Sequence, residues 1–433
     1  MFFKKGCTRD KVTDKKALFS SFQKQKCMFN FLKCFLFILI TLNVVGQKHM
    51  PNIKKGNWEG NLQLNKTTSL PFAFIINKKN KTYSYFVCNG EERIMLVQDK
   101  ISKDSLVLSF PLFNSTLVLK INNPKLLTGY WLNLNKGINY KIPCEIKICS
   151  KSNDSESSLP TNFDGKWEST FEPNTADSYK AIGLIKQTNK TLQGTFLTET
   201  GDYRYLSGEV SDDNLFLSCF DGSHAFLFTG KMKNDSIYGS FYSGKHWETT
   251  WEARKNDSFE LTNPDSLTFL VDTALLNFNL PDLDGNNFNF PNDSFKGKVT
   301  IIQIMGTWCP NCMDETKYFK ELKNKYGNQG LEIISIGYEV GNTFEEHASK
   351  IISLQKRLDL DFKFLVGGAA NKDLASEQFK MLSHIISFPT AIFISRDGSV
   401  KKIHTGFSGP GTGDYYLDYI KETELLIESM LKK

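Results

Sequence analysis

The stretch VTIIQIMGTWCPNCMDE, residues 299–315, decides how the C-terminal part of this chain folds. It begins with an apolar run that is typical of a buried central strand. The residues after the second cysteine are amphipathic as far as Gly327, where a helix cap is expected. The stretch therefore predicts a strand followed by a helix, with Cys309 and Cys312 at the junction between them.

This junction makes the first cysteine the better nucleophile. A thiolate at a helix N-terminus faces unpaired backbone N–H groups and the positive end of the helix dipole, and both lower the thiol pKa. Cys312 lies one helical turn further on and is expected to be more buried, so it is suited to resolve a mixed disulfide. Pro310 fits the first helical position, where its missing N–H costs nothing. The pair therefore predicts a redox couple in which Cys309 attacks.

A metal site is the main chemical alternative for two cysteines at this spacing. Such a site needs two further ligands, and the sequence downstream holds no second Cys-x-x-Cys motif. The histidines downstream are His347, His384 and His404, and a lone histidine near a loop is usually only solvated. We therefore expect neither a metal nor another cofactor.

Beyond residue 257 the sequence alternates strand-like and helix-like segments. This alternation indicates a βαβ unit with parallel strands. Two strand-like runs joined by the tight turn RDG then predict a hairpin, and an amphipathic helix closes the chain. The expected elements are strands at 299–305, 331–338, 362–367, 388–395 and 400–407, and helices at 310–327, 344–358 and 414–431.

Four motifs together make this region specific: LPDLDG at 280–285, FKGKV at 295–299, WCPNC at 308–312 and FPT at 388–390. By these motifs, the chain from about Leu275 to its end resembles the TlpA-like branch of thioredoxin-fold thiol-disulfide oxidoreductases, which are found in bacterial cell envelopes. The resemblance implies an α/β thioredoxin-like domain.

The resemblance also implies a role for each residue of the site. Cys309 is then the nucleophile of a redox-active disulfide and Cys312 its resolving thiol, while Pro389 is the cis-proline that faces this disulfide. The residues expected to contact substrate are Trp308, Pro310, Phe388 and Pro389.

Glu315 matches an acidic position that is thought to assist proton transfer in many relatives. The alternative is a surface glutamate in the first turn of a helix, stabilised by the dipole. Thioredoxin itself has a buried aspartate six residues before its first cysteine, whereas this chain has Gln303, which cannot titrate. Proton handling is therefore expected to rest on Glu315, water or the partner.

Between residues 57 and 254 the sequence consists of short strand-like runs separated by polar turns, as in an all-β region. It is also internally repeated, because GNWEG at 56–60 recurs as GKWES at 165–169, an offset of 109 residues. We expect two small antiparallel barrels or sandwiches. Trp58 and Trp167 are interpreted as buried plugs of these modules, with ligand stacking as the alternative.

The basic charge of the chain is concentrated at its start. Residues 1–46 hold nine Lys or Arg and two acids, although the whole chain carries a formal charge of +6. The rest is near neutral, which argues against nucleic acid binding. An apolar run that begins at Cys34 follows the lysines and reads as a secretory signal peptide, with an uncleaved membrane anchor as the alternative. We expect an exported protein of the periplasm or cell envelope.

The expected organisation is multidomain. An exported protein can hold structural disulfides, so a bridge among Cys88, Cys144 and Cys149 is possible, although sparse thiols, Cys219 included, are more often buried singles. The predicted segments are a leader and signal peptide at 1–46, a first β module at 47–150, a second at 151–256 with the linker 150–160 at their boundary, and a thioredoxin-like domain at 257–433.

These observations favour an enzyme, a thiol-disulfide oxidoreductase that reduces the disulfides of envelope proteins and is recharged by a membrane thiol electron donor. The Pro-Asn dipeptide and the local charge tune the potential of such a couple, so an oxidase or isomerase is the alternative. A non-enzymatic alternative is a partner-binding protein whose β modules carry the function.

Overall fold

The computed structural model describes residues 52–80, 82–149, 161–271 and 275–432. The expected leader and the expected linker at 150–160 lie outside the described residues. Within the described ranges, no helix combines the length and the apolar character that crossing a membrane requires.

The first β module is a closed antiparallel barrel in which each strand pairs with the next and the last pairs with the first. Burial alternates along its strands because successive side chains point to opposite faces. Closure leaves no sheet edge exposed. The strands are β1 (Gly56–Gln63), β2 (Ser69–Lys79), β3 (Thr82–Asn89), β4 (Glu92–Ile101), β5 (Ser105–Ser109), β6 (Ser115–Asn123), β7 (Leu126–Asn133) and β8 (Lys141–Ile148).

The second β module closes in the same way, since β10 pairs with both β9 and β11, and β17 returns to β9. The short strand β12 pairs with β11 only and lies outside the ring. The strands are β9 (Gly165–Phe171), β10 (Tyr179–Thr188), β11 (Thr191–Thr198), β12 (Gly201–Asp202), β13 (Leu206–Ser211), β14 (Asn214–Phe220), β15 (Ala225–Lys233), β16 (Ser236–Ser243) and β17 (Trp247–Lys255).

The repeated tryptophans occupy equivalent places in the two barrels. Trp58 is 1% exposed and Trp167 is 2% exposed. Each donates its indole N–H to a backbone carbonyl four residues earlier, that of Lys54 at 3.1 Å and that of Phe163 at 2.8 Å. The prediction that both are buried in their own modules is confirmed, and stacking on a ligand is excluded by their burial.

The C-terminal domain is built on a five-stranded sheet of order β22–β21–β20–β23–β24. The βαβ prediction is confirmed, because β20 runs parallel to β21 and β21 to β22, and the hairpin β23–β24 is antiparallel. A separate hairpin, β18–β19, precedes the sheet. The elements are α2 (Pro264–Leu267), β18 (Phe278–Pro281), β19 (Asn287–Phe290), β20 (Val299–Met305), α3 (Pro310–Tyr326), β21 (Leu331–Glu339), α4 (Phe344–Leu358), β22 (Lys363–Ala369), α5 (Lys372–Gln378), β23 (Thr390–Ile394), β24 (Val400–Thr405) and α6 (Asp414–Leu431).

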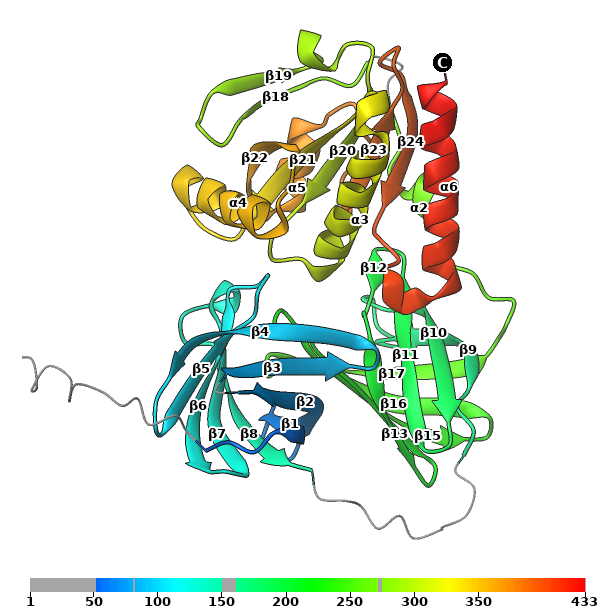
Figure 1. Ribbon diagram of the computed structural model, residues 1–433. Helices are drawn as coiled ribbons and strands as arrows, with labels where there is room; N and C mark the ends of the chain where they lie inside the picture. Colours follow the sequence, from blue (N-terminus) through cyan, green and yellow to red (C-terminus); the bar gives the residue numbers. More distant parts are fainter. Residues whose placement is uncertain (1–51, 81, 150–160, 272–274, 433) are drawn as a thin grey trace, which may run out of the picture. The chain divides into compact units, whose positions relative to one another are not determined.

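Both faces of the central strand β20 are covered, which explains its apolar sequence. Ile301 and Met305 belong to a core that includes residues of α3, α4 and α6. Ile302 and Ile304 belong to another core, formed with the β18–β19 hairpin and α5. Figure 1 shows α3 in front of this sheet and α6 beside β24. A strand buried on both faces reads as an almost continuous apolar run.

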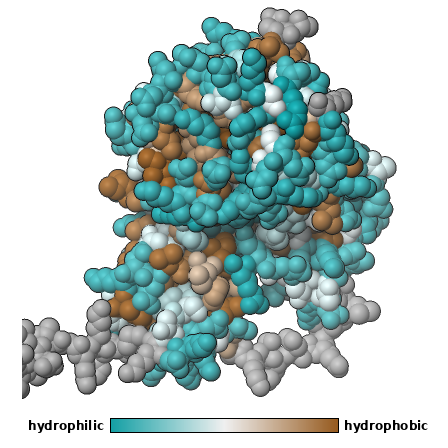
Figure 2. All heavy atoms as spheres, turned by 45° about the horizontal axis from the view of Figure 1, so that its top comes forward, coloured by the Kyte–Doolittle hydropathy of each residue, from teal (hydrophilic) through white to brown (hydrophobic). Residues whose placement is uncertain are grey.

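Among the residues that the structure describes, the cysteines outside the 309–312 stretch are free. Cys88, Cys144 and Cys219 are buried singly and Cys149 is exposed. The alternative of a structural bridge among the first β module's cysteines is therefore wrong. On the face seen in Figure 2 the surface is mostly hydrophilic, and hydrophobic residues are scattered among polar ones.

Candidate redox site

The two cysteines form a disulfide at the start of α3, with their Cα atoms 5.3 Å apart. Cys309 is the N-cap residue of this helix, and the backbone N–H of Cys312 donates to its Sγ at 3.2 Å. Cys309 is 7% exposed and Cys312 is fully buried. The sulfur of Cys309 thus lies where free N–H groups and the helix dipole stabilise an anion, with its partner one turn deeper.

Pro310 occupies the first turn of α3, as its missing N–H predicts. Trp308, on the other side of Cys309, donates its indole N–H to the Tyr338 carbonyl oxygen at 2.9 Å. This bond fixes the indole against the end of β21, next to the disulfide.

The segment before β23 completes the site. The Phe388–Pro389 peptide bond is cis. The Phe388 carbonyl oxygen lies 3.6 Å from Cys309 Sγ, and the Phe388 ring lies 6.2 Å from that of Trp308. The structure therefore brings together the two cysteines and the four residues that the sequence predicted to contact substrate.

Glu315 is fully buried, so the alternative of a surface glutamate is wrong. Its Oε2 accepts from Gln303 Nε2 at 2.9 Å, and the same amide nitrogen lies 3.4 Å from the Cys312 carbonyl oxygen. Oε1 has no hydrogen-bond partner within the described part of the chain. Burial raises the pKa of Glu315 to about 8, and the hydrogen bond from Gln303 acts in the opposite direction. Glu315 therefore holds a proton at neutral pH and can exchange it there.

A second buried carboxylate, Glu339, escaped the sequence analysis. It lies at the end of β21 and accepts from the backbone N–H of Thr307 at 2.7 Å and from the Thr307 hydroxyl at 2.6 Å. Burial raises the pKa of Glu339 to about 7. It holds the loop that leads into Cys309. The available signal was an acid directly after the apolar run 331–338, a position where strand ends meet at one edge of the sheet.

Side chains of the second barrel also reach this site, and no local signal in the sequence pointed to them. Ser223 donates its hydroxyl to the Trp308 carbonyl oxygen at 3.0 Å. Arg204 forms an ion pair with Asp314 of α3. Contacts between residues about a hundred positions apart depend on packing, which periodicity and motifs do not encode.

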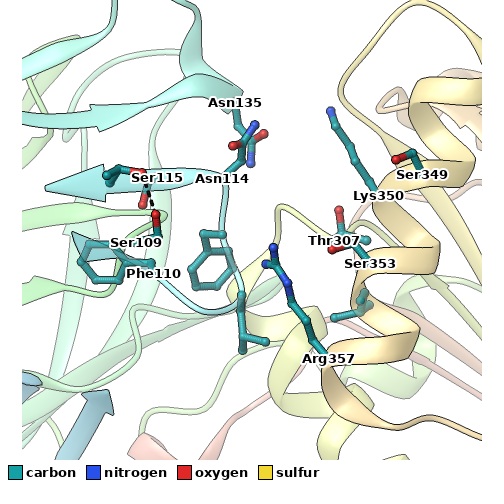
Figure 3. A pocket seen from close by; sticks show the side chains of 14 residues that line it. Ser109, Phe110, Asn114, Ser115, Asn135, Thr307, Ser349, Lys350, Ser353 and Arg357 are labelled. Carbon is teal, nitrogen blue, oxygen red and sulfur yellow. Dashed lines mark hydrogen bonds between the residues drawn. The ribbon is translucent and has the colours of Figure 1, made fainter. Parts of the chain in front are cut away.

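A polar pocket of about 280 Å³ is lined in part by Thr307, and no cysteine is among the residues that line it. Figure 3 shows Lys350, Ser353 and Arg357 of α4 on one side and Asn114 of the first barrel on the other. Arg357 donates to the Pro111 carbonyl oxygen at 2.7 Å and so bridges the two sides. No group of three or more His, Cys, Asp or Glu side chains that would suit a metal occurs in the described ranges.

The chain is similar to known proteins over this region. The Redoxin family model matches residues 270–416. The thiol-disulfide oxidoreductase ResA of Bacillus thuringiensis subsp. konkukian is 30% identical over 146 residues, which cover 34% of this chain and 74% of that protein. ResA of Halalkalibacterium halodurans is 27% identical over the same shares of the two chains.

Solved structures are also similar to part of this chain. A putative protein disulfide isomerase from Bacteroides thetaiotaomicron is 17% identical with a TM-score of 0.28, covering 38% of this chain and 93% of that one. A thiol:disulfide interchange protein from Chlorobium tepidum is 18% identical with a TM-score of 0.27, covering 37% and 96%.

Proposed function

Because this chain belongs to the redoxin family of thioredoxin-fold thiol-disulfide oxidoreductases, we propose that it reduces the disulfides of proteins in the cell envelope through Cys309 and Cys312. The observation that carries the proposal is the position of Cys309. It is the N-cap of α3, within bonding distance of a fully buried second cysteine.

The reaction is a two-step exchange. The Cys309 thiolate attacks one sulfur of the client disulfide and displaces the other as a thiolate, which leaves a mixed disulfide. Cys312 then loses its proton and attacks Cys309 Sγ, which releases the second client thiolate. The client gains two electrons, and the protein ends with the Cys309–Cys312 disulfide.

Glu315 is the group we assign to proton exchange at Cys312. It lies one helical turn beyond this cysteine, and Gln303 bridges its carboxyl group to the Cys312 carbonyl oxygen. With a pKa of about 8, the ionised fraction of Glu315 takes the Cys312 proton in the resolving step, and the protonated form returns it when the disulfide is reduced again. A membrane thiol donor then reduces the disulfide and restores the dithiol.

Support for the envelope location comes from the apolar run in the leader, which reads as an export signal. The β modules supply surfaces for docking clients or the electron donor. Their interiors are filled by large aromatic side chains such as Trp131 and Trp251, so the interior is not where they bind.

The direction of the reaction is tested by the equilibrium potential of the couple in a glutathione or dithiothreitol series, together with insulin reduction. A reductase requires a potential well below that of a strong oxidant. A value above about −150 mV together with no insulin reduction would instead indicate an oxidase or isomerase.

The roles of the two cysteines are tested by trapping. Cys312→Ser is expected to accumulate mixed disulfides with clients, because the attacking thiol remains and the resolving thiol is gone. Cys309→Ser is the matched control and is expected to trap none. Non-reducing gels of envelope extracts measure both, and equal trapping by the two variants would reverse the assignment.

A further inference from the structure

A turn of the second barrel, residues 199–205, lies across the motifs that border the disulfide. The Thr200 carbonyl oxygen accepts from the Ser387 hydroxyl at 3.1 Å. Asn311, which stands between the two cysteines, donates Nδ2 to the Asp202 carbonyl oxygen at 3.2 Å. The turn therefore contacts both the Cys-x-x-Cys segment and the loop before Pro389.

A second turn, residues 220–224, lies beside the first and is anchored at its start. Phe220 is fully buried, and its ring lies 4.8 Å from that of Phe72 and 5.1 Å from that of Trp131, both in the first barrel. The Ser223 hydroxyl, three residues later, donates to the Trp308 carbonyl oxygen. The anchor thus limits how far this turn can move from the disulfide.

Arg204 joins these parts. Its side chain is 6% exposed and forms ion pairs with Glu92 of β4, Asp221 of the second turn and Asp314 of α3. Its Nη1 also lies 3.4 Å from the Pro310 carbonyl oxygen. One buried guanidinium therefore connects both barrels to the helix that carries the cysteines, and its planar fork is suited to several carboxylates at once.

Cys309 is only 7% exposed, and the turn contacts the segments that flank it, at Asn311 and Ser387. We propose that Arg204 is a specificity-determining residue. By holding the turn 199–205 against α3, it admits small disulfides to Cys309 and excludes disulfides on bulky folded segments unless the turn is displaced. This inference rests on the proposed function.

The same contacts indicate the kind of client that displaces the turn. Ser387 and Asn311 donate to backbone carbonyl oxygens of the turn, at Thr200 and Asp202. An extended client segment offers equivalent carbonyl oxygens, so it takes the place of the turn as acceptor, while Phe407 and Phe388 supply second acceptors for the same donors. The client is therefore a protein whose disulfide lies on a flexible, extended stretch.

The test compares two substrates in single turnovers of the reduced protein, quenched with acid and alkylated. The substrates are 2-hydroxyethyl disulfide and insulin. Arg204→Ala is expected to raise the rate constant for insulin about tenfold, because more molecules have the turn displaced. The rate constant with the small disulfide reports any change in the reactivity of Cys309 itself, since Arg204 lies near the start of α3, so the quantity compared is the ratio of the insulin rate constant to the small-disulfide rate constant.

Three further variants make the result specific. Arg204→Lys keeps the charge but loses the planar fork. Its ratio of the insulin rate constant to the small-disulfide rate constant is expected to lie between those of wild type and Arg204→Ala. Arg254→Ala is the matched control, since Arg254 lies in the same barrel, is 70% exposed and pairs with Glu168. Its ratio is expected to match wild type. Ser223→Ala removes the bond to Trp308 and is expected to raise the ratio.

An unchanged ratio in folded Arg204→Ala, or in Ser223→Ala if the arginine variant does not fold, overturns the inference.

Alkylation of Cys309 separates this result from a failure of the proposed function. Arg204→Ala is expected to accelerate labelling by a polyethylene-glycol maleimide more than by N-ethylmaleimide. If wild type reduces neither disulfide but this difference is found, the proposed function fails and the inference stands. If the difference is absent, the inference fails.

Discussion

At the residue scale, two buried carboxyl groups support the site: Glu315, which the sequence analysis named for proton handling, and Glu339, which it did not name. Glu315 carries the proton that Gln303 cannot hold, and the two side chains are 2.9 Å apart. Glu339 holds Thr307 and so the loop before Cys309. Both pKa values are raised mainly by burial, to about 8 and about 7.

The raised pKa of Glu315 predicts a dependence of stability on pH. Below pH 4.5, its ordinary pKa, the group is protonated in both the folded and unfolded states. Between that value and about 8 the unfolded state has released the proton and the folded state has not, so the free energy of unfolding falls as pH rises. Above pH 8 the group is ionised in both states, so this penalty, the loss of unfolding free energy caused by burying the ionised carboxylate, is constant.

Glu315→Gln lacks this penalty. The oxidised variant is expected to match wild type near pH 4 and to be more stable near pH 9 by a few kcal/mol, since a change of one in pKa corresponds to about 1.4 kcal/mol. Urea unfolding at both pH values measures the difference. Equal stability of the two proteins near pH 9 would contradict the buried, proton-holding state of this residue.

Glu339→Ala is expected to lower the free energy of unfolding by about 2–3 kcal/mol, because two partly buried donors of Thr307 lose their acceptor. Glu345→Ala is the control, since Glu345 is exposed on α4 and its loss is expected to cost less than about 0.5 kcal/mol. Urea unfolding at neutral pH compares them. Similar losses in both variants would show that Glu339 does not support the loop.

At the element scale, the start of α3 determines the chemistry of the site. The helix begins at Pro310 and its N-cap is the attacking cysteine, so backbone N–H groups are directed at the sulfur. Every residue of β20 is buried, which fixes the position where this helix begins. The site is therefore held by a rigid strand and a rigid helix.

The helix start predicts an acidic thiol. In the reduced protein, alkylation of Cys309 by iodoacetamide is expected to be half-maximal well below pH 8.5, the ordinary value for a cysteine thiol. The experiment uses a Cys149→Ser background, because that thiol is exposed and would react as well. Cys309→Ser in the same background identifies the fast phase. A midpoint at or above about 8.5 would remove the basis for assigning Cys309 as the nucleophile.

At the scale of the whole molecule, Phe220 connects the two barrels. It belongs to the second barrel, yet it packs among the aromatic side chains of the first. Phe220→Ala is expected to lower the free energy of unfolding by about 3–5 kcal/mol. Phe216→Ala, on the same strand with 38% exposure, is the control and is expected to cost less than about 1 kcal/mol. Thermal unfolding and limited proteolysis measure both, and equal effects would exclude Phe220 as an anchor.

Much of the fold was readable because its signals are local. The predicted helices at 344–358 and 414–431 coincide with α4 and α6, and the repeat of 109 residues places equivalent tryptophans in two barrels. Apolar periodicity is found in neighbouring residues, and a repeat is found by comparing the sequence with itself. Neither requires knowledge of the fold. The same holds for the Cys-x-x-Cys pair at the strand–helix junction.

The amino-acid sequence by itself determined the two β modules, the βαβ unit and the two cysteines that make the chemistry. Only the tertiary structure decided that Glu315 is buried, that Glu339 supports the loop before Cys309, and that Arg204 of the second barrel reaches α3. The physical reason is that burial and ion pairing depend on which distant segments pack together, and this packing sets both the pKa of a carboxyl group and the access to a sulfur.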